Sequence, residues 1–201
     1  MAEKWATFDC YGTLVDWNAG LRAALGGSDE LLERYHEVEP EVQSDDPSRS
    51  YRDVMRETAR RLGVDADPAE SLPQWPVFPD VRPALEEARR RGWRLAILSN
   101  SDRDLIESSI ESIGVPFDLA IVASEVGSYK PVDGHWLAFA REVGSMPDAH
   151  VAQSHFHDVV PAMRLGVPTI WINRLGEVQD PPPTAQLPTL EGLADALDEV
   201  A

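Results

Sequence analysis

From residue 80 onward, short apolar runs alternate with longer segments that have helical spacing, and most of these segments stop at a glycine. Short apolar runs bounded by polar residues or glycine are typical of buried strands. Their alternation with helices predicts βαβ units, because neighbouring parallel strands need a long crossover between them. We therefore predict an α/β fold with a parallel sheet covered by helices on both faces. The expected strands are residues 5–8, 94–98, 119–122, 151–152 and 169–172, and the expected helices are residues 80–91, 102–113, 132–143, 158–165 and 190–200.

A second pattern, helical and without strands, follows the first expected strand and covers residues 18–63. Ser28 is a candidate N-cap for one helix, and residues 50–62 have the spacing of another. Residues 68–79 contain four prolines, so we expect an irregular connection there. The chain is thus expected to have a core of residues 1–15 and 79–201, with a small helical unit of residues 16–78 inserted after the first strand.

Length and charge restrict the classes of protein that this chain can belong to. It has 201 residues, enough for one domain with a modest insertion, and a formal net charge of −17. A surface this acidic repels phosphate backbones, so we expect no nucleic acid as a partner. The single Cys10 allows no internal disulfide, and neither a leader sequence nor a long apolar run is evident. We expect a soluble cytoplasmic protein with no membrane contact.

Lysine is scarce in this chain: Lys4 and Lys130 are the only lysines among 18 basic residues. An ammonium group is a compact point charge, whereas a guanidinium is a planar fork, so the two are not interchangeable. Either Lys130 fills a place where arginine would not serve, or its position is due to chance. The count alone does not decide between them.

Polar residues follow several of the predicted strands. Asp9 ends the first strand, Ser99 and Asn100 end the next, and residues 153–158 follow a later one. Ligands of open parallel sheets bind outside the carboxyl ends of the strands. An aspartate in that place can act as a nucleophile, with the backbone of a tight turn stabilising negative charge. Taken singly, each of these groups could equally cap a helix.

In combination, four motifs resemble the haloacid dehalogenase superfamily, and within it the type II 2-haloacid dehalogenases. The resemblance covers nearly the whole chain and implies a Rossmann-like core domain with a small helical cap domain inserted after the first strand. The motifs are Asp9-x-Tyr11-Gly12-Thr13, Leu98-Ser99-Asn100, Tyr129-Lys130-Pro131, and Asp158 ahead of residues 166–174.

Most members of this superfamily are Mg²⁺-dependent phosphatases, and this chain departs from their pattern at two places. Their first motif is Asp-x-Asp, whose second acid protonates the leaving group, but Tyr11 stands there. Their last motif resembles Gly-Asp-x-x-x-Asp, but here Gln153 and Ser154 precede Asp158. The loss of two carboxylates weakens a Mg²⁺ site and acid catalysis, and halide needs no proton to leave. We expect no metal and no cofactor. A phosphatase with degraded motifs and a non-catalytic binding protein on the same fold stay open as alternatives.

The resemblance implies a reaction like that of an (S)-2-haloacid dehalogenase. Asp9 attacks C2 of a 2-haloalkanoate, displaces halide with inversion and forms an ester, which water then hydrolyses to a 2-hydroxy acid. Lys130 orients Asp9 and balances its charge. Asp158 holds Lys130 and helps to position the water.

Further roles are implied for groups around this centre. Thr13 and Ser99 bind the substrate carboxylate or Asp9, and Asn100 donates to the departing halide. Family members also use an arginine of the first cap helix to bind halide, for which Arg34 is the candidate and Arg22 the rival. Either arginine could instead make a surface salt bridge.

Residues 153–158 differ from the dehalogenase pattern, because two histidines stand beside Asp158 in place of asparagine and tryptophan. His155 is the candidate general base for the water, since an imidazole pKa suits that role. His157 is the second choice, and either ring could merely pack against the loop. Trp136 is expected to be a pocket wall. His135 and His150 are expected at the surface.

These expectations define one candidate site and one class of partner. The partner is a small molecule, a short 2-haloalkanoate or related acid; a homodimer is compatible with the sequence, which selects no oligomeric state. The expected catalytic residues are Asp9, Lys130, Asp158 and His155. The expected substrate-binding residues are Tyr11, Thr13, Ser99, Asn100, Arg34 and Trp136.

Overall fold

A parallel sheet of six strands organises the computed structural model, which describes residues 3–201. Its order is β3-β2-β1-β4-β5-β6, so the chain turns to opposite sides of β1, which pairs with β2 on one edge and β4 on the other. This Rossmann-like arrangement confirms the predicted α/β fold. The strands are β1 (Lys4–Phe8), β2 (Trp93–Ser99), β3 (Leu119–Val122), β4 (Ala149–Ala152), β5 (Thr169–Ile172) and β6 (Ala185–Leu187).

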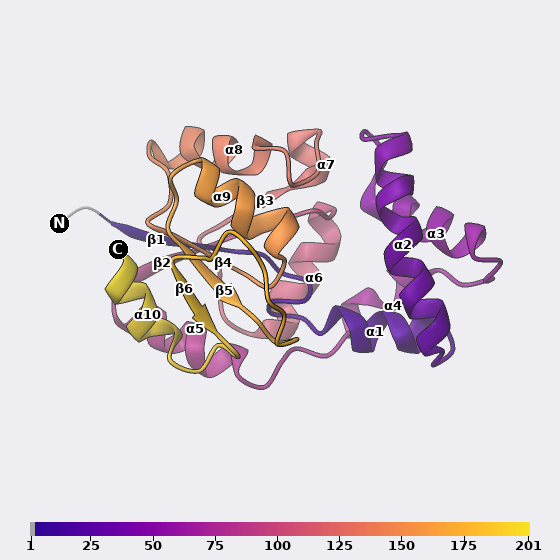
Figure 1. The fold of residues 1–201 in the computed structure, drawn as a ribbon, viewed down its shortest axis with the longest axis horizontal. Coiled ribbons are helices and arrows are strands. Elements are labelled where there is room, and N and C mark those ends of the chain that lie inside the picture. The colour runs from indigo at the N-terminus through magenta and orange to yellow at the C-terminus, as the bar shows by residue number, and fades with distance from the viewer. Residues whose placement is uncertain (1–2) are drawn as a thin grey trace.

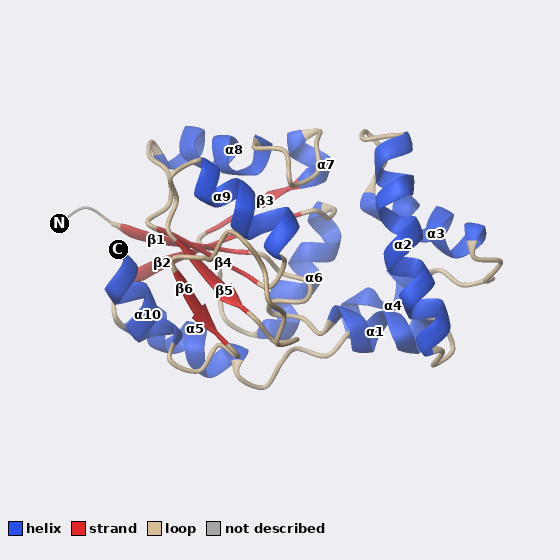
Figure 2. Ribbon diagram, in the orientation of Figure 1, coloured by secondary structure: helices blue, strands red, loops and turns tan. Residues whose placement is uncertain are grey.

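Helices cover both faces of the sheet, as Figure 2 shows. Side chains alternate between the faces of β1, so that Phe8 packs on one side and Trp5 on the other. The Phe8 face is covered by α5 (Val81–Arg90), α6 (Arg103–Ile113) and α10 (Leu193–Val200). The Trp5 face is covered by α8 (Gly134–Val143) and α9 (Val160–Arg164), and the short α7 (Ala123–Val126) follows β3.

Four helices between β1 and α5 form a separate group beyond the carboxyl ends of the strands (Figure 1). We call this group the α1–α4 segment. The predicted N-cap is confirmed, because the Ser28 side chain accepts a hydrogen bond from Leu31 N. Gly20 lets the Trp75 ring lie directly against α1, since a Cβ at this position would overlap that ring. Its helices are α1 (Trp17–Ala24), α2 (Asp29–Asp45), α3 (Tyr51–Arg61) and α4 (Pro68–Ser71).

Several local predictions were wrong. Residues 68–79 are not wholly irregular: Pro68 opens α4, where its missing N–H costs no hydrogen bond, and a 3₁₀ turn, Leu72–Gln74, follows. The helix expected at residues 158–165 begins earlier, in a π-helical turn, His155–Val159. Strand β6 and helix α7 were not predicted, because three or four residues are too few to show a period.

Two core side chains hold the start of α3. Asp102 accepts hydrogen bonds from Tyr51 N (3.1 Å) and Arg52 N (2.9 Å), although it lies at the start of α6. The Tyr129 hydroxyl donates to Arg49 O (2.7 Å). The loops after β2 and β3 therefore fix the position of the α1–α4 segment. Among residues 3–201, no helix is both long and apolar enough to span a membrane.

Candidate active site

Asp9 directly follows β1, the strand at which the sheet order changes direction. Its backbone N–H donates to Val151 O (3.1 Å), which ties it to the neighbouring β4. Thr13 Oγ1 donates to Asp9 Oδ2 (3.0 Å) and accepts from Gln153 N (2.9 Å). Burial raises the pKa of the Asp9 carboxyl, while the Lys130 ammonium and the Thr13 hydroxyl oppose that rise. Asp9 is thus held rigidly and keeps 7% of its surface exposed.

Lys130 lies between two carboxylates. Its Nζ donates to Asp9 Oδ1 (2.9 Å), Asp158 Oδ1 (2.5 Å) and Leu98 O (2.8 Å), so all three ammonium protons are used. Burial alone would lower the pKa of Lys130, but Asp158 and Asp9 outweigh it and raise the pKa. The three acceptors converge on one nitrogen atom, which a planar guanidinium could not match. This geometry gives a physical reason why position 130 carries a lysine in a chain whose other basic residues are almost all arginines.

Asp158 has a second buried partner, His150, whose Nε2 lies 3.0 Å from Asp158 Oδ1. The other ring nitrogen, Nδ1, lies 2.9 Å from Thr7 Oγ1. Burial would raise the pKa of Asp158, but Lys130 and His150 together lower it to about 2. The predicted surface position of His150 was wrong, because the ring is 1% exposed.

Asn100 and His135 support the loops of the site. Asn100 Oδ1 accepts from Lys130 N (2.6 Å), and its Nδ2 donates to Lys130 O (3.0 Å). Both the oxygen and the nitrogen of the Asn100 amide therefore bond to the Lys130 backbone, whereas a donor to halide was expected. His135 was also expected at the surface, but it is buried, with Nε2 3.0 Å from Ser99 O. Burial lowers the pKa of His135 to about 4, so the ring is neutral at pH 7.

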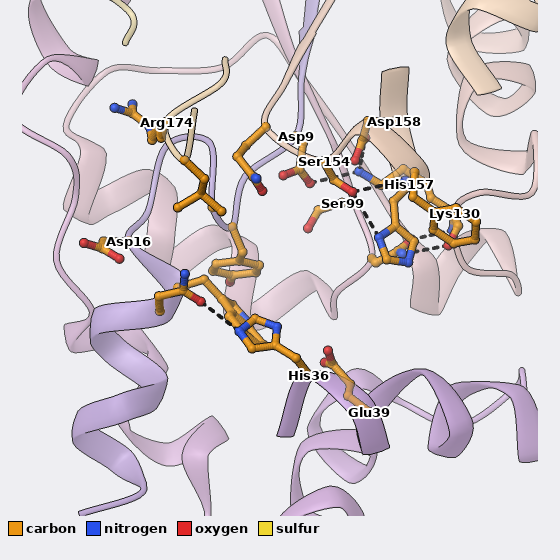
Figure 3. Close-up of a pocket in the computed structure, with 18 of the residues that line it drawn as sticks. Asp9, Asp16, His36, Glu39, Ser99, Lys130, Ser154, His157, Asp158 and Arg174 are labelled. Atoms are coloured by element: carbon orange, nitrogen blue, oxygen red, sulfur yellow. Dashed lines mark hydrogen bonds and ion pairs between the residues drawn. The ribbon is translucent and has the colours of Figure 1, made fainter. Parts of the chain in front are cut away.

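A cavity of about 610 Å³ separates these residues from the α1–α4 segment. Figure 3 shows Asp9, Ser99 and Lys130 on one side of it and His36 and Glu39 on the other. Of the predicted residues, Asp9, Tyr11, Ser99, Asn100, Lys130 and Asp158 line the cavity, and Thr13 lies behind Asp9.

Among the predicted residues that line the cavity, Ser99 is the one whose side-chain polar atom is buried without a partner within residues 3–201. Its Oγ is buried and makes no hydrogen bond to any of residues 3–201. Figure 3 places it beside Asp9. An unsatisfied buried hydroxyl in a cavity wall is suited to donate to a ligand oxygen, since burial without a partner is costly. Tyr11, in contrast, places its ring in the wall and its hydroxyl 3.0 Å from Ser109 Oγ.

The two histidines before Asp158 point in different directions. His155 Nε2 lies 2.8 Å from Pro181 O, its ring packs against Trp171, and it does not line the cavity. His157 does line it. Its Nδ1 lies 3.2 Å from Ser154 Oγ, and its Nε2 has no hydrogen-bond partner within residues 3–201. The expectation that His155 reaches the site was therefore wrong, and His157 takes that place.

Two further expected contacts lie away from the cavity. Trp136 is fully buried and packs against His150 and the Trp5 face of the sheet, so it is a core residue. Arg34 is exposed on α2 and does not line the cavity. Its rival Arg22 forms a surface ion pair with Asp29. Among the described residues, the α1–α4 segment therefore contributes no arginine or lysine to the cavity wall.

A polar stripe on α2, which was not predicted, also lines the cavity and consists of His36, Glu39 and Gln43. These positions are three and four residues apart, so they share one face of the helix. Burial raises the pKa of Glu39 to about 7, although a hydrogen bond with the Tyr51 side chain acts to lower it. In the sequence the stripe has the composition of a solvated helix face, so no local signal distinguishes it.

Arg174 was also missed. It follows β5, lines the cavity and forms an ion pair with Asp80 (3.0 Å) while its guanidinium stacks on Phe78. Its charge is therefore already partnered. Among residues 3–201, no group of three or more His, Cys, Asp or Glu side chains is arranged to hold a metal ion. The chemistry that the described site offers is a held carboxylate, a buried ammonium and a neutral imidazole.

Comparisons with known proteins give a consistent family. Residues 3–152 match the family described as haloacid dehalogenase-like hydrolase. The (S)-2-haloacid dehalogenase of Pseudomonas sp. (strain YL) is 29% identical over 210 residues, which covers 87% of this chain and 84% of that protein. A phosphoserine phosphatase of Thermus thermophilus is 30% identical over 140 residues, 64% of this chain and 56% of that protein. The solved L-2-haloacid dehalogenase of Xanthobacter autotrophicus is alike in fold, with a TM-score of 0.82, 21% identity, and coverage of 99% of this chain and 100% of that chain.

Proposed function

Because the chain belongs to the haloacid dehalogenase-like hydrolases, we propose that it is a metal-independent hydrolase of carbon–halogen bonds. Its substrate is a 2-haloalkanoate and its product a 2-hydroxy acid. The observation that carries the proposal is the Asp9 carboxylate, held by Thr13 and Lys130 at the floor of the cavity, without a second carboxylate at position 11 to protonate a leaving group.

The first step is displacement at carbon. An oxygen of the Asp9 carboxylate attacks C2, the C–O bond of an ester forms, and halide leaves with the electron pair of the carbon–halogen bond. Attack requires the ionised carboxylate, which Lys130 and Thr13 stabilise against the effect of burial. The Ser99 hydroxyl donates to the substrate carboxylate and thereby orients C2.

The second step is hydrolysis of the ester. Water attacks the carboxyl carbon of Asp9 and passes its proton to His157 Nε2, which is open to the cavity. Burial lowers the pKa of His157, so the ring is neutral and able to accept a proton at pH 7. Collapse of the tetrahedral intermediate expels the alkoxide of the 2-hydroxy acid, which takes the proton back from His157. The second proton of the water stays on Asp9 and is then lost to solvent, which restores the carboxylate.

Residues 16–78 act in this proposal as a cap domain on a core of residues 1–15 and 79–201. The α1–α4 segment supplies one wall of the cavity, including Trp17 and Tyr51. Exclusion of bulk water by this wall strengthens the electrostatic interactions inside the site.

The test is chloride release from racemic 2-chloropropionate in the presence of EDTA, with wild type compared with Asp9→Asn. We expect release by the wild type alone. Equal release by both proteins, or no release by either, would contradict the proposal.

The Thermus thermophilus relative supports a second candidate, a Mg²⁺-dependent phosphatase. That activity would appear as hydrolysis of p-nitrophenyl phosphate that EDTA abolishes. The same protein preparation therefore distinguishes the two reactions.

A further inference from the structure

Glu39 stands on the cavity wall that faces Asp9. Figure 3 shows Glu39 and His36 projecting from α2 into the cavity, across from Lys130 and Asp9. Glu39 Oε1 is buried and has no hydrogen-bond partner within residues 3–201. A buried carboxylate oxygen without a partner is unfavourable unless a ligand supplies a donor.

The protein supplies no cation to this wall within the part of the chain that the structure describes. Among the described residues, the lysine that lines the cavity is Lys130 and the arginine is Arg174. Lys130 is shared by Asp9 and Asp158, and Arg174 is paired with Asp80. Glu39 is therefore an acidic group on the α2 wall for which no arginine or lysine of the described cavity provides a counter-charge.

The neighbouring His36 offers a second hydrogen-bond acceptor on this wall. His36 Nε2 lies 3.1 Å from Asn18 Oδ1, so the ring donates there and keeps Nδ1 as an acceptor when it is neutral. Burial lowers the pKa of His36, which favours that neutral form. Two acceptors on one wall suit a ligand group with several donors, such as a primary ammonium.

Between the two walls the cavity is aromatic. Tyr11, from the loop after β1, and Tyr51, from α3, line it with rings stacked at a centroid distance of 6.4 Å. Trp17 adds a third ring. Such a surface suits a short methylene chain, and a cation beyond the chain gains from the aromatic faces.

From this arrangement we infer that the substrate carries a primary ammonium at the end remote from the halogen and that Glu39 binds it. The substrate class is thus an ω-amino-2-haloalkanoate, and the inference rests on the proposed dehalogenation. Ser99 then binds the carboxylate of the zwitterionic substrate and Glu39 binds its ammonium, with C2 placed at Asp9.

The test compares kcat/KM for chloride release from 6-amino-2-chlorohexanoate and from 2-chlorohexanoate, which differ only in the terminal ammonium. The proteins are wild type, Glu39→Gln and Glu41→Gln, whose exposed side chain lies on the same helix outside the cavity. We expect wild type and Glu41→Gln to prefer the amino substrate by at least about tenfold. In Glu39→Gln the two substrates should fall within about twofold of each other. A wild type without the preference, or Glu39→Gln with it, would overturn the inference.

Failure of dehalogenation itself is separable from failure of the ammonium site. If neither substrate releases chloride, calorimetric binding of 6-amino-2-hydroxyhexanoate and 2-hydroxyhexanoate decides the inference. The site is supported if the wild type binds 6-amino-2-hydroxyhexanoate more tightly than 2-hydroxyhexanoate and if Glu39→Gln loses this difference. Equal binding of the two acids to the wild type refutes it.

Discussion

His150 and Lys130 contact the same oxygen of Asp158, at 3.0 Å and 2.5 Å respectively. One contact comes from β4 within the core, and the other from the side chain that also reaches Asp9. Asp158 is therefore kept ionised at any pH well above 2 without being exposed to solvent. Its role in the proposed reaction is to hold the ammonium that holds the nucleophile.

Lys130→Met should destabilise the fold strongly at pH 7. The change leaves Asp9 and Asp158 buried without their cation, and breaking a buried ion pair costs about 3–5 kcal/mol. The folded pKa of Asp158 in the wild type is about 2, below its usual 3.8, so its contribution is present above pH 3.8 and is lost as the pH falls toward 2. In the variant, burial raises that pKa instead, and the deficit in unfolding free energy should shrink from pH 7 to pH 5.

Urea denaturation at the two pH values measures this effect. Lys4→Met is the matched control, because it removes the other lysine, whose ion pair with Asp198 is exposed and worth at most about 1 kcal/mol. A Lys130→Met protein as stable as Lys4→Met would contradict the role given to the buried ammonium.

Ser99→Ala should raise KM for 2-chloropropionate by about tenfold and leave the unfolding free energy unchanged within about 0.5 kcal/mol. The hydroxyl has no hydrogen-bond partner within residues 3–201, so its removal costs the described protein no bond. Ser109→Ala provides a comparison, because Ser109 pairs with Tyr11 and should lower stability instead. A large loss of stability in Ser99→Ala with normal KM would show that the residue is structural.

His157→Ala should slow the second step and accumulate the ester on Asp9. Mass spectrometry of the peptide that contains Asp9, after incubation with substrate, should show the added mass of a 1-carboxyalkyl group in a large fraction of molecules. His155→Ala should accumulate none, because that ring is bonded to Pro181 O outside the cavity. Accumulation in the second variant alone would reverse the assignment of the base.

Glu39→Gln should stabilise the protein, and more so at higher pH. The folded pKa of about 7 lies above the usual 4.5, so the wild type loses stability as the pH rises from 4.5 through 7. One pKa unit corresponds to about 1.4 kcal/mol, which limits the gain to about 3 kcal/mol at pH 8. Thermal unfolding at pH 5 and pH 8 measures it. A difference in Tm that does not change with pH would show that Glu39 does not ionise in this range.

The sheet and the centre of the site were predictable from the sequence because topology links them. Parallel strands bring their carboxyl ends to one edge, so residues that follow separate strands, such as Asp9 and Ser99, must meet. The scarcity of lysine pointed to Lys130, although only its three acceptors explain the choice.

Other parts of the site depend on geometry that the sequence does not encode locally. The π-helical turn after Ser154 changes which side chain faces the cavity, so that His157 rather than His155 reaches it. The stripe with Glu39 lies next to the apolar stripe of α2 and has the composition of a solvated face. Arg34 was expected in the site because family members place an arginine on the first cap helix. Among the described residues, however, the α1–α4 segment contributes no arginine to the cavity wall.

Asp102 illustrates the same limit at the level of the fold. Asp102 is the residue just before α6 and makes no side-chain cap to that helix; its carboxylate binds the first N–H groups of α3 instead. A contact across about 50 residues has no local signature. The partner of Asp102 can be identified only when the position of α3 relative to the core is known.

The hydrogen bonds from Asp102 and Tyr129 to the start of α3 also couple the position of the α1–α4 segment to that of the proposed catalytic loops. They arise from the loops that carry Asn100 and Lys130, so the α1–α4 segment cannot swing outward without pulling on those loops or breaking the bonds.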